Sequence, residues 1–241
     1  MLKINTRLLF LFFFSCILLC FSSCIKKAPI NRITQVLLVP LSPNSLASDF
    51  SIDGILYANT IGYSTTVGTV RYTLPYYTVT PKNTVISYNF NGLPGSIASV
   101  TKDLEEDKAY STFLIDSVHK AKVVLVTDDL TEPTPGKVKI RFFHFSPNTV
   151  SLDVVISGQT NKLFSNRSFN DQASTSTHEN FIEIDAGTYT FLFNNSATGA
   201  TLYTTSSQVL LPDRIYTIAA RGFTGGATNL ALGAWVYPNK P

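Results

Sequence analysis

The chain has 241 residues, of which 44% are hydrophobic, 12% aromatic and only 15% charged. Its 17 Phe and 11 Tyr residues supply enough apolar surface to offset chain entropy, which excludes a disordered chain. The formal net charge of +3 is too small to indicate a nucleic-acid partner.

The first residues predict a secretory signal peptide, residues 1–23. Lys3 and Arg7 precede an apolar run of 14 residues, from Leu8 to Phe21. A membrane-spanning helix is the alternative, but crossing a bilayer takes roughly 20 apolar residues. The shorter run therefore favours a signal peptide that is removed from the mature protein.

Cys24 follows this segment in a sequence that resembles a bacterial lipobox. Phe21 is the bulky apolar residue of the box, where leucine is usual, and two serines separate it from the cysteine. The resemblance implies that Cys24 carries a thioether-linked diacylglycerol and acyl chains such as palmitate, with residues 24–33 as a tether. Because Ile25 is not the acidic residue associated with inner-membrane retention, we expect an outer-membrane lipoprotein that faces the periplasm or the cell surface. After cleavage Cys24 is the single cysteine, which excludes an internal disulfide and a cysteine-ligated metal.

The rest of the chain is patterned for short β-strands. Apolar or alternating runs are bounded by Pro, Gly, Asn or Asp, and no segment keeps a helical period of 3.6 residues. The predicted strands are residues 36–39, 50–55, 85–90, 112–116, 123–127, 138–145, 153–157, 181–184, 189–193, 208–211, 216–221 and 230–236. Short strands at this spacing, about seven per copy of the repeat described next, predict β-sandwiches.

An internal repeat divides the body into two domains. Residues 41–54 align without gaps to residues 145–158, with six of fourteen positions identical. The identical pairs are Ser42/Ser146, Pro43/Pro147, Asn44/Asn148, Asp49/Asp153, Ile52/Ile156 and Gly54/Gly158. A period of 104 residues is typical of tandem domains rather than of a solenoid. We therefore predict an all-β chain with two tandem immunoglobulin-like or transthyretin-like antiparallel β-sandwiches, residues 34–130 and 137–241, joined by a Pro/Gly linker at 131–136.

The repeated residues are interpreted as a structural turn motif. Ser-Pro-Asn fits a turn that leaves the first strand of each copy. Asp49 and Asp153 open the following strand, and we expect their carboxylates to accept backbone N–H bonds from that turn; a ligand or metal carboxylate is the alternative. The motif comprises Ser42, Pro43, Asp49, His144, Ser146, Pro147 and Asp153.

These residues carry a family resemblance. The segment 141–154, with His144, Ser146 and Asp153, resembles the His-x-Ser-Pro…Asp-Val opening of the bacterial domain of unknown function 4397. Residues 186–189 and Tyr216-Thr217 are similar to later elements of that family. The likeness covers residues 137–236 well and 33–130 more weakly, and it implies an exported, often lipid-anchored and tandem β-sandwich with no assigned activity.

No set of residues predicts catalysis, a metal or a cofactor. A Ser-His-Asp set could be drawn from Ser146, His144 and Asp153, but the chain has no Gly-x-Ser-x-Gly elbow to present the serine. The acidic run 103–107 lacks the spaced carboxylates and central glycine of an EF-hand. Residues 222–226 precede no helix pattern and are interpreted as a hairpin loop rather than a phosphate-binding loop.

The predicted function is therefore a lipid-anchored, non-catalytic binding or structural module of the cell envelope, whose partner is a glycan or another envelope protein. A serine hydrolase is the alternative of another class. Tyr63, Tyr72, Tyr76 and Tyr77 form a possible exposed ligand platform for a glycan, since aromatic rings in a polar stretch can stack on sugars. The alternative is that residues around Tyr76 are further strand residues.

Overall fold

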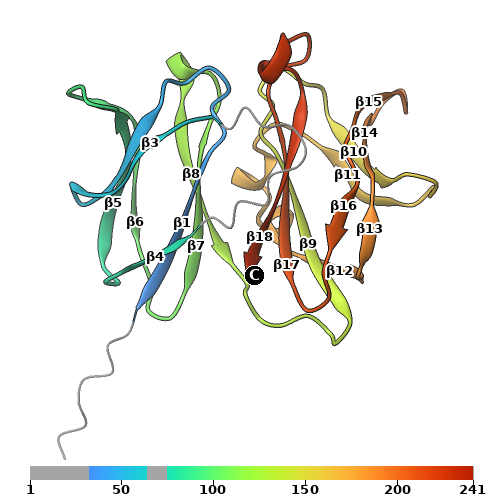
Figure 1. The fold of residues 1–241 in the computed structure, drawn as a ribbon, viewed down its shortest axis with the longest axis horizontal. Helices are drawn as coiled ribbons and strands as arrows, with labels where there is room; N and C mark the ends of the chain where they lie inside the picture. Colours follow the sequence, from blue (N-terminus) through green and yellow to red (C-terminus); the bar gives the residue numbers. More distant parts are fainter. Residues whose placement is uncertain (1–32, 64–74, 241) are drawn as a thin grey trace, which may run out of the picture. The chain divides into compact units, whose positions relative to one another are not determined.

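The computed structural model describes residues 33–63 and 75–240, and Arg32–Pro241 form one compact unit (Figure 1). Cys24 and Tyr72 lie outside the described residues, so the predictions that rest on them stay predictions. Within the described part of the chain, no helix has the length and apolar character needed to span a membrane.

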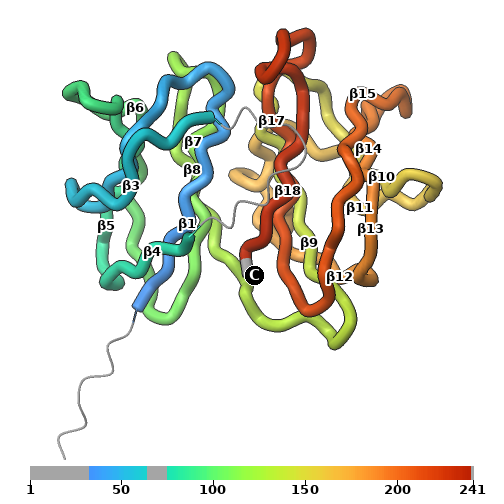
Figure 2. Tube along the Cα trace, viewed as in Figure 1, coloured from blue at the N-terminus to red at the C-terminus, as the bar shows by residue number. Residues whose placement is uncertain are grey.

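The described residues are almost entirely strands joined by turns. The first eight strands are β1 (Thr34–Pro40), β2 (Ser48–Ile52), β3 (Ile55–Ile61), β4 (Tyr76–Val79), β5 (Asn83–Phe90), β6 (Ser96–Asp103), β7 (Ala109–Ile115) and β8 (Lys122–Asp128). A short 3-10 turn, η2 (Val118–Lys120), connects the last two. Figure 2 shows the chain completing these strands before it enters β9.

Ten strands follow: β9 (Lys137–His144), β10 (Leu152–Ile156), β11 (Lys162–Arg167), β12 (Ile182–Asp185), β13 (Gly187–Tyr189), β14 (Phe191–Asn195), β15 (Thr201–Thr204), β16 (Gln208–Leu210), β17 (Ile215–Arg221) and β18 (Gly233–Lys240). Three more 3-10 turns are η3 (Asp171–Ala173), η4 (Ser176–Glu179) and η5 (Thr228–Leu230).

Each half contains two four-stranded sheets in the same spatial order. The first half has sheets β4-β1-β7-β8 and β3-β2-β5-β6, and the second has β12-β9-β17-β18 and β11-β10-β14-β15, with β13 and β16 as an additional pair. The predicted all-β sandwich class is confirmed. Most neighbours are antiparallel, but β1 pairs with β7 and β9 pairs with β17 in parallel.

Each sandwich has its own apolar core, because alternate side chains of a strand point to opposite faces. In the second half Val138, Ile140 and Phe142 of β9 point into a core that also holds Phe191 and Phe193. In the first half, β1 and β2 supply a matching core with side chains such as Val36, Leu38, Phe50 and Ile52. The alternate positions of a strand in the sequence thus correspond to the side chains that enter the core of its sandwich.

A third apolar cluster joins the two halves. It is formed by the opposite faces of β1, β7 and β9, and the rings of Phe113 and Phe143 lie 5.3 Å apart at its centre. Its buried members are Leu37, Val39, Leu41, Phe113, Ile115, Val126, Phe143, Phe145, Ala219 and Tyr237. Strands β1, β7 and β9 are therefore buried on both faces, which explains the consecutive apolar residues within each of them, such as Phe142 and Phe143 in β9.

The structure contains strands that the sequence analysis did not predict. Strands β3, β6, β11 and β15 have many exposed positions. Strand β4 was expected only as the alternative to a tyrosine platform, and it has a single fully buried residue. Without a regular apolar face, these segments carry a weak periodic signal. The predicted run 189–193 is also divided, because Thr190 separates β13 from β14.

Candidate functional site

A buried polar network lies beside the apolar cluster between the halves, with Arg141 of β9 at its centre. The Arg141 side chain is fully buried and its Nη2 donates to Asp128 at the end of β8. Its Nε donates to Thr217 Oγ1 on β17 at 2.8 Å. Further hydrogen bonds of this kind offset the cost of burying an ion pair, although the buried Arg141 Nη1 has no hydrogen-bond partner among the described residues.

Asp128 is satisfied by three donors. Besides Arg141, the hydroxyls of Tyr76 and Ser111 each donate to Asp128 Oδ2 at 2.7 Å. Burial, and then the neighbouring Asp128 carboxylate, raise the pKa of the Tyr76 hydroxyl, which therefore remains a donor. Asn239 of β18 donates to the Tyr76 oxygen at 3.2 Å and extends the network into the second half.

Two phenylalanine rings enclose the Arg141 guanidinium. Its central carbon lies 4.8 Å from the ring centroid of Phe143 and 4.5 Å from that of Phe181. Guanidinium groups are attracted to aromatic faces at such distances. Phe181 precedes β12, so this contact fixes the start of that strand against the network.

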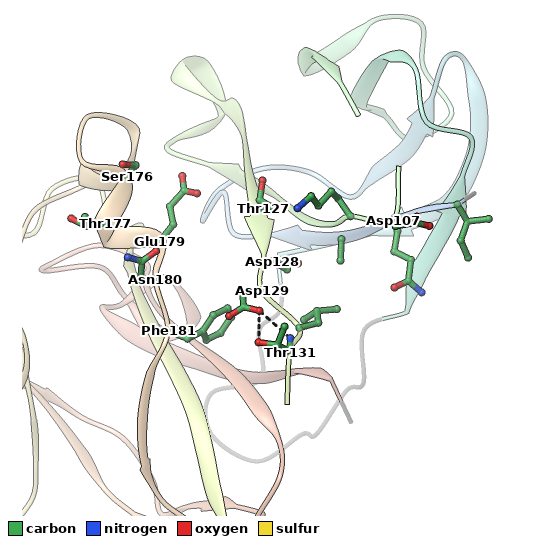
Figure 3. A pocket seen from close by; sticks show the side chains of 15 residues that line it. Asp107, Thr127, Asp128, Asp129, Thr131, Ser176, Thr177, Glu179, Asn180 and Phe181 are labelled. Carbon is green, nitrogen blue, oxygen red and sulfur yellow. Dashed lines mark hydrogen bonds between the residues drawn. The ribbon is translucent and has the colours of Figure 1, made fainter. Parts of the chain in front are cut away.

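A cleft of about 1130 Å³ opens above this network, between the end of β8 and the η4 segment. In Figure 3, Ser176, Thr177, Glu179, Asn180 and Phe181 lie on one side, and Asp107 lies on the opposite side. Asp128, Asp129 and Thr131 lie between them in this view. The other lining residues are Ile33, Gln35, Lys108, Ala109, Thr127 and Leu130.

An ion cluster holds the η4 wall in place. Arg167 donates to both oxygens of Asp171 at 2.8 and 2.9 Å, and to the backbone carbonyl of His178 at 3.2 Å. His178 Nδ1 lies 2.9 Å from Asp171 Oδ2. Because Arg167 and Asp171 are buried, this wall of the cleft is built before any ligand arrives.

The polar groups of the cleft fall into two sets. Asp128 is saturated by the network, and Asp129 is bound to Lys139 Nζ at 2.9 Å and to Thr131. In contrast, the structure gives the side chains of Glu179 and Asn180 no hydrogen bond to any described residue. Burial raises the pKa of the half-buried Glu179, although nearby Arg141 opposes the rise. Among the described residues, the Glu179 carboxylate therefore has no hydrogen-bond donor.

The structure places His144 and Ser146 in a closed turn rather than in a cleft. Ser146 is buried, and its hydroxyl donates to the Gly222 carbonyl at 2.6 Å and contacts Thr149. His144 Nδ1 accepts the Ser146 backbone N–H at 3.3 Å, and its Nε2 bonds the Val150 carbonyl at 3.1 Å. Ser42 is also fully buried, next to Pro43, and Pro147 follows Ser146 in the equivalent turn.

Asp49 and Asp153 have equivalent places in the two halves. Asp49 accepts the backbone N–H of Thr60 at 3.0 Å, and Asp153 accepts that of Asn166 at 2.8 Å. The donors lie at irregular positions of the neighbouring strand, where Thr60 and Asn166 have φ values of 53° and 49°, and not in the Ser-Pro-Asn turn as expected. Both carboxylates thus stabilise a strained bulge.

The tyrosines proposed as an exposed platform do not form one. Tyr63 is only 7% exposed and packs its ring 4.6 Å from Arg221, and Tyr76 is committed to Asp128. Tyr77 packs edge-on against Tyr57 at 5.6 Å in the first core. Tyr76 and Tyr77 lie on β4, which pairs with β1, and each packs partly buried against one of the apolar clusters. Tyr72 lies outside the described residues.

The fold and the cleft define a class of protein, a pair of β-sandwiches with a cleft of mixed polar and apolar lining at their junction. The chain belongs to the family described as a domain of unknown function, DUF4397, whose model matches residues 34–155. The matched residues lie mostly in the half where we expected the weaker likeness. Comparison with curated proteins gives no match.

One solved structure resembles the chain weakly. It is described as "Alpha-glucan binding by a streptococcal virulence factor", is 15% identical, and covers 74% of this chain and 88% of its own, with a TM-score of 0.21. A likeness at this level carries no argument about the ligand of this chain.

The cleft residues Glu179, Asn180 and Phe181 and the network residue Arg141 were not predicted from the sequence as site residues. One signal was present for Arg141: it is a charge within an apolar run, on the same strand face as Phe143 and Phe145. An arginine among aromatic residues on a covered face indicates a buried ion pair. No comparable signal marked Glu179 or Asn180, which belong to a polar segment.

Proposed function

We propose that this chain is a lipid-anchored, non-catalytic binding module of the bacterial cell envelope, and that its ligand is held in the cleft beside η4. The observation that carries the proposal is the half-buried Glu179, which lines a preformed cleft and has no donor among the described residues. Clefts with a few convergent polar groups and a perturbed carboxylate are the usual places for ligands.

The geometry around Ser146 does not favour hydrolysis by this residue. Its hydroxyl is buried and engaged by Gly222 and Thr149, and His144 faces its backbone N–H instead of its hydroxyl. A serine nucleophile needs an accessible oxygen within reach of the base. A serine hydrolase built on these residues is therefore not part of the proposal.

Two further features belong to the proposal. The equal strand order of the two halves supports two tandem domains of the DUF4397 type. The Phe21-Ser22-Ser23-Cys24 sequence supports acylation of Cys24 and an outer-membrane location. Mass spectrometry of the native protein should find an acylated Cys24 as the first residue, whereas an unmodified Cys24 or an intact Met1 would contradict the anchor.

Site-specific photocrosslinking in intact cells tests the cleft. A photoreactive amino acid at Thr177, which is exposed on the cleft wall, should give a discrete adduct. The matched control is the same group at Thr160, an exposed threonine in the turn between β10 and β11 that does not line the cleft. An adduct at both positions, or at neither, would contradict a ligand held in the cleft.

A further inference from the structure

We infer that the ligand of the cleft is a neutral oligosaccharide, and that Phe181 is the platform on which one sugar ring stacks. The inference rests on the proposed function and names the ligand class of the same site. It is carried by the supported Phe181 ring, by the unpaired polar side chains around it, and by the balance of charge in the cleft.

Phe181 is held as a rigid platform. The Arg141 guanidinium lies 4.5 Å from its ring centroid, and Arg141 is itself fixed by Asp128 and Thr217. Phe181 remains half-buried and lines the cleft, so the uncovered part of the ring borders the ligand space. A ring that is fixed before binding loses little conformational entropy when a ligand stacks on it.

The polar groups next to Phe181 match sugar hydroxyls. Ser176, Thr177, Glu179 and Asn180 line the cleft, and the structure gives their side chains no hydrogen bond to described residues. Together they offer hydroxyls, a carboxylate and an amide, which are both donors and acceptors. A sugar hydroxyl both donates and accepts, so a row of them can satisfy such a mixed set.

The charge balance of the cleft disfavours charged polymers. Asp128 is paired with Arg141, and Asp129 is paired with Lys139. The remaining charged residues that line the cleft are two acidic residues, Asp107 and Glu179, and one basic residue, Lys108. Strongly charged ligands are recognised by clefts lined with one sign of charge.

The size of the cleft indicates an oligomeric ligand. Pockets for single drug-sized molecules measure roughly 300–1,000 Å³. At about 1130 Å³ the cleft lies above that range, and it is lined from both halves of the chain. A chain of several sugar units fits this space better than a monosaccharide does.

Titration calorimetry of the full-length chain, purified in a detergent without a sugar headgroup, tests the inference. The probes are neutral hexasaccharides of glucose, mannose and xylose, with hexalysine and hexagalacturonate as charged counterparts. We expect at least one neutral hexasaccharide to bind and both charged probes to fail. Phe181→Ala should weaken that binding about tenfold, because one aromatic stacking contact is lost. Phe181→Trp should retain the binding, because it keeps an aromatic ring at this position.

Phe169→Ala is the matched control, because Phe169 is also half-buried beside a cation, Lys122 at 5.3 Å, but does not line the cleft. If Phe181→Ala fails to fold, Glu179→Gln combined with Asn180→Ala should weaken binding instead. Binding of a charged probe alone, no binding of a neutral one, or equal losses in Phe181→Ala and Phe169→Ala would overturn the inference. If no neutral probe binds while the Thr177 adduct forms in cells, the ligand class is wrong and the proposed function stands.

Discussion

At the scale of single residues, the stability of the fold should be sensitive to substitution of either member of the Arg141–Asp128 ion pair. Both side chains are fully buried, so removal of one leaves an uncompensated charge. We expect Asp128→Asn to lower the free energy of unfolding by about 3 kcal/mol in denaturant titrations. The neighbouring Asp129→Asn should cost less than about 1 kcal/mol, because the Asp129 side chain is 57% exposed. Equal losses in the two variants would contradict the buried network.

His144 gives the fold a pH dependence. Burial lowers the pKa of His144 below its ordinary value, so near neutral pH the unfolded chain binds a proton more readily than the native chain. The stability that the neutral, buried His144 contributes is therefore complete above about pH 6.5. It is lost as the pH falls toward the pKa of His144 in the folded chain. Denaturant titrations from pH 7.5 to 5.5 should show a falling stability in the wild type.

In His144→Gln the decrease in the free energy of unfolding from pH 7.5 to 5.5 should be smaller than in the wild type. His119→Gln is the matched control, since His119 is exposed in η2, and it should keep the wild-type slope. An unchanged slope in His144→Gln would show that His144 is not the source of the pH dependence.

At the scale of elements, the two repeated aspartates stabilise equivalent strand bulges. Hydrogen bonds from Asn91 and from the Thr60 backbone lower the pKa of Asp49. For Asp153 burial acts in the opposite direction, but hydrogen bonds from Lys162 and the Asn166 backbone still lower its pKa. Each carboxylate is therefore ionised when it accepts its backbone N–H.

Hydrogen exchange can separate the two bulges. In Asp153→Ala the Asn166 amide should exchange faster, because its acceptor is gone, while the Thr60 amide keeps its protection. Asp49→Ala should give the reverse pattern and serves as the control. Unchanged protection of Asn166 in Asp153→Ala would mean that the carboxylate does not hold the bulge.

Much of the fold could be predicted from the sequence because buried strands carry a strong periodic signal. The apolar runs that became β1, β7 and β9 were recognised, and the repeat at Asp49 and Asp153 marks equivalent places in two sheets of the same order. Exposed strands such as β11 were missed, since one half-buried face gives little pattern.

The candidate site could not be predicted in the same way. Glu179 and Phe181 are close in sequence to each other but face residues such as Asp128, which lie far away in the chain. Glu179 and Phe181 line the cleft only because the two halves pack together. The local periodicity of one sequence contains no signal for a contact between distant segments. The polar stretch around Tyr76 led to the proposal of an exposed platform, but the structure confirms the alternative, that these residues belong to a strand, β4.

At the scale of the whole molecule, the apolar cluster between the halves should make their unfolding cooperative. Phe113 lies 5.3 Å from Phe143 and 4.9 Å from Phe145, measured between ring centroids. Calorimetry of the full-length chain should show one transition. Phe113→Ala should resolve it into two, because it removes a contact between the halves.

The matched control is Phe142→Ala, which removes a ring inside the second core and leaves the cluster between the halves intact. A loss of about 3–5 kcal/mol is expected for such a core truncation, with a lower unfolding temperature. Two transitions in the wild type, or a single one in Phe113→Ala, would contradict cooperative unfolding through this cluster.

A ligand held in the cleft should contact both of its walls, because the cleft is lined from both halves of the chain. The most direct measurement places the photoreactive amino acid in turn at Thr177, on the wall from the second half, and at Lys108, on the wall from the first half. We predict that both positions crosslink in cells to a component of the same mass, and that Phe181→Ala reduces both adducts together. Adducts of different mass, or an adduct from one wall alone, would contradict a ligand bound between the halves.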